Sequence, residues 1–167
     1  MPSTPHWFKD MVVVGISPGT RYMGFAILRD RKLVKWQLLS FPDKWSKEKL
    51  QAILSSLDNY IGHSCTQAIA IKIPDELPIS ESYIQLVGAI NVLCERKKIQ
   101  PLYYTLKELK LRFCDTKSVN KHCLAKAITG VYPELEVYVN QKNNADRLYY
   151  EKIFEAVAAA HALQNEV

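Results

Sequence analysis

Two polar residues stand in apolar segments of this sequence, at positions from which a side chain could act on a bound molecule. Ser17 closes the run Met11–Ser17, and Lys72 is the one charged residue of the run Ala68–Ile73. A serine becomes a nucleophile when a neighbouring base accepts its proton and an oxyanion hole stabilises the developing charge. Lys72 could serve as that base, but no other feature of the sequence supports this activity.

Basic residues concentrate in the segment 96–126, which holds nine lysines and arginines and two acidic residues. This segment carries a net charge of +7, whereas the whole chain carries +5, so the remainder carries −2. A positive segment of this kind binds polyanions such as nucleic acid, or it forms a solvated face on two helices. The charge by itself leaves both interpretations open.

The histidines and cysteines show no spacing that is typical of a metal site. None of the four histidines (His6, His63, His122 and His161) stands at a zinc-ligand spacing from a cysteine or another histidine. His161 is expected at the surface, near the end of the last helix. The four cysteines form no Cys-x-x-Cys pair, and we expect all of them to be reduced thiols.

The elements that position these residues follow from the hydrophobic pattern. Three apolar segments with short turns between them predict an antiparallel meander, and the rest of the chain alternates helices with two further strands. Ser80 and Thr105 are expected to cap the starts of two helices. The predicted strands are 11–17, 24–28, 33–41, 68–73 and 101–104; the predicted helices are 46–61, 80–97, one from 105, 118–129 and 145–163.

This order predicts an α/β protein with a mixed five-stranded sheet, built from a three-stranded antiparallel meander plus two parallel strands, with helices on both faces. The 167 residues, 48% of them hydrophobic, suit one domain over residues 11–167, preceded by a flexible arm at residues 1–10. No apolar run is long enough to cross a membrane, and the first residues do not resemble a signal peptide. We therefore expect a soluble, cytoplasmic protein.

Several segments, taken in order, resemble the RuvC-type Holliday-junction resolvases of the RNase H-like superfamily. The most specific is the opening Val14-Gly15-Ile16-Ser17-Pro18-Gly19-Thr20, which is followed by Gly24-Phe25-Ala26. Weaker matches follow over roughly residues 11–161, at 68–74, 82–89, 102–104, 109–112, 118–121 and 152–158. The resemblance implies an RNase H-like fold.

The resemblance also implies a site of four carboxylates that bind two Mg²⁺ ions for DNA cleavage. This chain has Ser17, Lys72, Lys152 and Glu155 at the four matching positions, so Glu155 alone keeps an acid. An ammonium at such a position repels divalent cations. We therefore predict a degenerate site without metal or cofactor, in which Lys72 pairs with Glu155, and a catalytically inactive pseudoenzyme.

Two other interpretations remain open at this stage. The chain could be an active nuclease that uses Mg²⁺ or Mn²⁺ bound by displaced carboxylates; the available acids are Asp75, Glu76, Asp146, Glu151 and Glu155. It could also be a dimeric scaffold or protein-interaction module that kept the fold.

The resemblance implies DNA, including branched DNA, as the partner, and a homodimer as the assembly. The matching basic segment would contact the phosphate backbone through Lys107, Lys110, Arg112, Lys117 and Lys121. The pairs Tyr103-Tyr104 and Tyr149-Tyr150 could stack on bases, although paired tyrosines are more often divided between core and surface.

Overall fold

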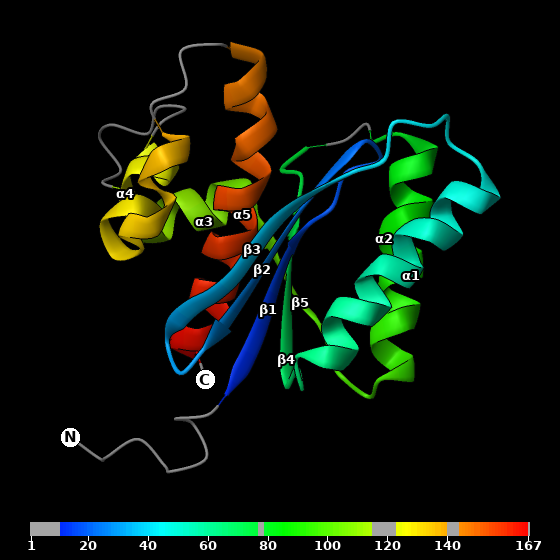
Figure 1. The fold of residues 1–167 in the computed structure, drawn as a ribbon, viewed down its shortest axis with the longest axis horizontal. Helices are drawn as coiled ribbons and strands as arrows, with labels where there is room; N and C mark the ends of the chain where they lie inside the picture. Colours follow the sequence, from blue (N-terminus) through cyan, green and yellow to red (C-terminus); the bar gives the residue numbers. More distant parts are fainter. Residues whose placement is uncertain (1–10, 77–78, 115–122, 140–143, 167) are drawn as a thin grey trace.

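The structure is a computed structural model that describes residues 11–76, 79–114, 123–139 and 144–166 (Figure 1). The predicted arm at residues 1–10 lies outside these residues, as do Lys117 and Lys121.

Five strands form one mixed sheet in the order β3-β2-β1-β4-β5. The strands are β1 (Val12–Ser17), β2 (Tyr22–Arg29), β3 (Lys32–Ser40), β4 (Ala68–Ile73) and β5 (Leu102–Thr105). The first three pair antiparallel, whereas β4 pairs parallel with both β1 and β5. This confirms the predicted meander and the two parallel strands.

Helices cover both faces of the sheet, as predicted (Figure 1). On one face lie α1 (Lys47–His63) and α2 (Glu81–Arg96). On the other lie α3 (Leu106–Phe113), α4 (Cys123–Val131), the short 3-10 helix η2 (Pro133–Tyr138) and α5 (Asn144–Glu166). None of the helices in the described ranges combines the length and the hydropathy that a membrane span requires.

Side-chain alternation along the strands separates large from small residues. In β1, Val12, Val14 and Ile16 join the hydrophobic cluster under α1 and α2, while Val13 joins the cluster under α5. Since successive side chains point to opposite faces, Gly15 and Ser17 also face α5. The same alternation places Ile69 and Ile71 of β4 under α1 and α2, and therefore turns Lys72 toward α5.

Helix α5 approaches the sheet closely because glycines line its path. A Cβ atom added at Gly15 would lie 1.9 Å from the carbonyl oxygen of Ala156, and one added at Gly24 would lie 1.9 Å from that of Lys152. The glycines of the opening motif therefore create the space in which the backbone of α5 rests on β1 and β2. This contact fixes the height of Lys152 and Glu155 above the sheet.

Hydroxyl caps fix the starts of three helices. Ser46, Ser80 and Thr105 accept hydrogen bonds from the backbone nitrogens of Lys49, Tyr83 and Glu108, which begins α1, α2 and α3. Two of these caps, Ser80 and Thr105, were predicted. Each satisfies a backbone donor that the helix itself leaves unpaired.

Some sequence-based expectations about the cysteines and the elements were wrong. Cys114 and Cys123 form a disulfide with a Cα–Cα distance of 5.9 Å, because the end of α3 and the start of α4 lie together. Helix α4 does not end at residue 129, as predicted, but continues to Val131. The segment after it, for which no helix or strand was predicted, contains η2, whose first residue Pro133 has a backbone angle already suited to a helical turn.

Candidate functional site

The four residues at the matching positions meet at one end of the sheet. Ser17 ends β1, and Lys72 lies near the end of β4, one residue beyond the parallel pair Ile16–Ile71. Lys152 and Glu155 are three residues apart on α5, so their side chains share one face of that helix. Two neighbouring parallel strands and the helix that crosses them therefore bring the four side chains together.

Glu155 is the centre of this cluster. Its Oε2 lies 2.8 Å from Nζ of Lys72, and its Oε1 accepts a hydrogen bond of 3.1 Å from Oγ of Ser17. The Lys72 and Glu155 side chains are only 12% and 10% exposed, and Ser17 is fully buried. The Lys72–Glu155 pair is present as predicted. Both carboxylate oxygens already have a partner from the chain.

Lys152 is the second cation of the cluster. Its Nζ donates a hydrogen bond of 2.9 Å to the carbonyl oxygen of Pro18, in the turn after β1. Burial lowers the pKa of Lys152, and the nearby Glu155 carboxylate partly opposes this effect. Gly19 makes room for the contact, since a Cβ there would stand 3.2 Å from both Cε and Nζ of Lys152.

Tyr83 is a further residue on which the charge of the cluster acts, and the sequence analysis did not single it out. It lies in the first turn of α2, and burial and then the negative charge of Glu155 raise the pKa of its phenol. The signal that could have found it is its place at the start of the helix that follows β4.

This set of residues does not fit a pair of divalent ions. Mg²⁺ requires several oxygen ligands, and a two-metal centre requires carboxylates that bridge the ions. The cluster offers one carboxylate, already bonded to Lys72 and Ser17, together with two ammonium groups. Within the described ranges, no group of three or more His, Cys, Asp or Glu side chains could hold a metal ion.

The spare carboxylates are not gathered into a second metal centre among the described residues. Oδ1 of Asp75 accepts a hydrogen bond of 2.7 Å from the backbone nitrogen of Lys107, at the start of α3, and Glu76 is exposed beside it. Glu151 shares a cavity with Glu155 on α5. The side chain of Asp146 lies outside the described part of the chain.

The predicted basic residues differ in their surroundings. Lys107 is exposed and Lys110 half-buried, both on α3. Arg112 forms an ion pair with Glu166 of α5 and lies over the Tyr104 ring, 5.3 Å from its centroid. Lys107 and Lys110 are therefore better placed than Arg112 to meet an external anion.

The two tyrosines of β5 divide between core and surface. Tyr104 is buried and its hydroxyl donates a hydrogen bond of 2.6 Å to Glu166, whereas Tyr103 is 37% exposed and bonds to Asn91. Tyr104 is therefore a core residue, and a stacking role is possible in this pair only for Tyr103. In the second pair, the Tyr149 side chain lies outside the described part of the chain.

The topology and the position of this site define an RNase H-like fold, and solved structures agree. No known family model and no curated protein matches the sequence. The chain is similar in structure to Thermus thermophilus RuvC in complex with a Holliday junction substrate, with a TM-score of 0.72, 18% identity, and 90% of this chain and 91% of that chain covered. A second Thermus thermophilus RuvC structure gives a TM-score of 0.71 at 17% identity, covering 93% and 96%. At this identity the likeness establishes the fold.

Proposed function

We propose that this protein binds DNA, including branched DNA, through the basic face of α3. The observation that carries the proposal is a likeness that extends over 90% of the chain to a RuvC whose structure holds a Holliday junction substrate. Lys107 and Lys110 support it, since they lie one turn apart on α3 and no ion pair joins either ammonium to a described side chain. Phosphate contacts of this kind give affinity without reading base sequence.

We further propose that the protein does not cleave the DNA it binds. The single carboxylate of the cluster is neutralised by Lys72, and the neighbouring Lys152 adds a positive charge. Such a centre lacks the carboxylate ligands that would hold the metal ions needed to generate a hydroxide. Divalent metal is thus not required for binding.

Fluorescence anisotropy with a labelled four-way junction and a linear duplex of matched sequence tests the binding proposal. We expect binding to both without added metal, with an affinity that falls steeply as salt increases. Lys107→Ala should weaken binding and reduce the slope of log affinity against log salt by about 1. Lys47→Ala, at an exposed lysine on α1, is the matched control and should change neither quantity.

If the protein binds neither the junction nor the duplex at low salt, the proposal is refuted and a scaffold function is favoured. An assay of the same junction with Mn²⁺ tests the second proposal, and we expect no cleavage. Cleavage that disappears in Glu155→Ala would instead establish an active nuclease.

We also propose that the protein forms a homodimer. Exposed apolar side chains lie on α2 and on the edge strand β5, at Ile84, Val92, Leu102 and Tyr103. Their burial against a second copy would remove them from water.

A further inference from the structure

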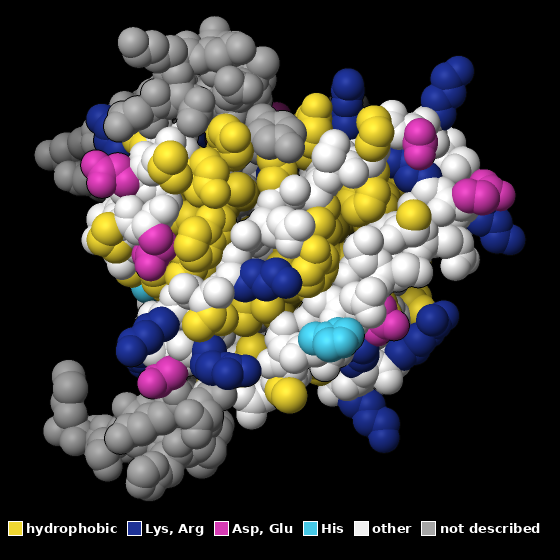
Figure 2. Space-filling view, in the orientation of Figure 1, with side chains coloured by type: hydrophobic (Ala, Val, Ile, Leu, Met, Phe, Trp, Pro, Cys, Tyr) yellow, Lys and Arg dark blue, Asp and Glu magenta, His cyan; other side chains and the backbone are white. Residues whose placement is uncertain are grey.

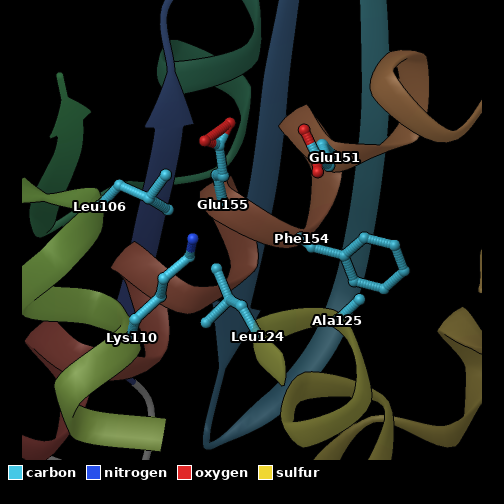
Figure 3. Close-up of a pocket in the computed structure, with 7 residues that line it drawn as sticks. All are labelled: Leu106, Lys110, Leu124, Ala125, Glu151, Phe154 and Glu155. Atoms are coloured by element: carbon cyan, nitrogen blue, oxygen red, sulfur yellow. The ribbon is translucent and has the colours of Figure 1, made fainter. Parts of the chain in front are cut away.

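A cavity of about 240 Å³ lies beside the site, between α3, α4 and α5 (Figure 3). Its walls are mainly apolar and come from all three helices. Leu106 belongs to α3, Leu124 and Ala125 to α4, and Phe154 to α5. Hydrophobic side chains also gather on the outer face of the molecule over α4 and α5 (Figure 2). The cavity is smaller than the range of about 300–1,000 Å³ typical for drug-sized ligands, so it suits one small ring system.

Three charged side chains complete the cavity. Glu151 and Glu155 stand one turn apart on α5, and Lys110 reaches toward them from α3 (Figure 3). A carboxylate oxygen has two lone pairs, and each oxygen of Glu155 uses one for Ser17 or Lys72. An ammonium has three donors. The cavity therefore presents both hydrogen-bond donors and acceptors next to an apolar wall.

This combination restricts the occupant. A small anion would meet the two carboxylates, and an alkyl chain offers no hydrogen-bonding group to Lys110 or to the carboxylate oxygens. A flat ring with ring-nitrogen or carbonyl acceptors and an amino donor matches every part of the cavity. A nucleobase with an exocyclic amine has this chemistry.

We propose that the cavity receives one unpaired, amine-bearing base of a bound DNA strand. This inference rests on the proposed function, because the DNA must first be held. Lys107, one turn before Lys110 on the same helix, would hold the backbone near the opening. The apolar wall would pack against the base, Lys110 would donate to its acceptors, and a Glu151 or Glu155 oxygen would accept from its amine. The site would then select DNA in which a base is already unstacked, as in junctions and bulges.

Three duplexes that differ at one bulged position test this inference. The bulge carries adenosine, thymidine or an abasic sugar, and the affinity of the whole chain is measured by anisotropy at fixed salt. We expect the adenosine bulge to bind about five-fold or more tightly than the abasic one, a factor in the range measured for a stacked base. Thymidine lacks the exocyclic amine and should fall between them.

Ala125→Phe fills the cavity and should abolish the preference for adenosine, while the affinity for the abasic duplex stays unchanged. Ala52→Phe, at an exposed position of α1, is the matched control and should keep the preference. If Ala125→Phe fails to fold, Ala125→Leu serves the same purpose, and the wild-type comparison needs no variant.

Equal affinity for all three duplexes would overturn this inference and leave DNA binding intact. If a folded Ala125→Phe variant still prefers the adenosine bulge, the cavity is not the source of that preference. No binding to any duplex would overturn the proposed function and this inference together.

Discussion

Lys72 is the ion-pair partner of the nearly buried Glu155 carboxylate, and its removal leaves that carboxylate without its closest cation. We expect Lys72→Met to lower the free energy of unfolding by about 2–3 kcal/mol, below the usual cost of breaking a buried pair, because Lys152 still lies nearby. The double variant Lys72→Met/Glu155→Leu should recover part of the loss, because the nearly buried carboxylate is then removed together with its cation, although the Ser17 hydroxyl loses its acceptor. Urea unfolding measures both, and a double variant no more stable than the single one would contradict this account.

A metal site should form when Ser17 and Lys72 are both replaced by acids. Ser17→Asp with Lys72→Glu would place three carboxylates, including Glu155, at the ends of β1, β4 and the facing turn of α5. We expect calorimetry to detect Mn²⁺ binding to this double variant and none to the wild type. Ser17→Asp alone is the control, since Lys72 continues to repel the ion. An equal heat of Mn²⁺ binding in the two variants would argue against a metal site at these positions.

His161 makes the stability of the fold depend on pH. Its Nδ1 lies 2.7 Å from the Tyr132 hydroxyl, and its ring packs against Phe113. His161 is therefore half-buried between other side chains, and the expectation that it lies at the surface was wrong. Burial lowers its pKa below the ordinary value of 6.5, and the charge of Arg31 lowers it further.

Because the folded state resists protonation of His161, the unfolded state gains protons first as the pH falls below about 6.5. The contribution to stability is therefore lost on acidification, and none is lost above neutral pH. We expect the melting temperature to fall between about pH 7 and pH 5, and to fall less in His161→Gln. Identical pH profiles for the two proteins would contradict this expectation.

At the scale of elements, the contact of α5 with β1 and β2 is the most sensitive to a single methyl group. Gly24→Ala would place a Cβ against the Lys152 carbonyl oxygen, so α5 would have to move away from the sheet. We expect a loss of about 2–3 kcal/mol in the free energy of unfolding, as for an overpacked core. Gly88→Ala is the matched control: nothing lies within 4 Å of a Cβ there, and alanine favours a helix interior by about 1 kcal/mol. Thermal unfolding of both variants separates the two cases, and a loss in Gly88→Ala equal to that in Gly24→Ala would refute the contact.

The same elements show what the sequence could and could not predict. Strand alternation and hydroxyl caps are local, so β4 and the caps of α2 and α3 were located from the sequence alone. The buried side of α2 consists of Leu86, Ile90, Leu93 and Cys94, and the sequence alone does not define it. Two overlapping stripes fit that helix, and packing against the sheet decides between them.

Contacts between distant segments could not be derived from periodicity. The Lys72–Glu155 pair was expected only because a family resemblance aligned the two positions, and the tertiary structure was needed to show that the charge of Glu155 acts on Tyr83. The Cys114–Cys123 disulfide was missed for a similar reason, since the spacing of two cysteines gives no information on the distance between two helix ends.

In the whole molecule, the two sides of the sheet serve different purposes. Large side chains such as Phe25 and Ile71 fill the layer under α1 and α2, whereas small residues let α5 rest almost directly on the strands. The side of the sheet covered by α5 carries the charged cluster, the cavity and the basic helix α3. The side covered by α1 and α2 carries the exposed apolar face of α2, next to the edge strand β5.

That apolar face is where a second copy of the chain should bind. Ile84 and Val92 are 56% and 44% exposed and lie on one side of α2, with Gly88 between them, so the surface there is smooth as well as apolar. Sedimentation velocity should give a dimer for the wild type and a monomer for Ile84→Glu, because a buried carboxylate without a partner opposes association. Val34→Glu, at the opposite edge of the sheet on β3, carries the same charge change at a 52% exposed position and should remain dimeric. A wild-type protein that is monomeric at concentrations where it binds DNA would refute the dimer, and single chains would then bind the DNA. An Ile84→Glu variant that remains dimeric would show that α2 is not the interface.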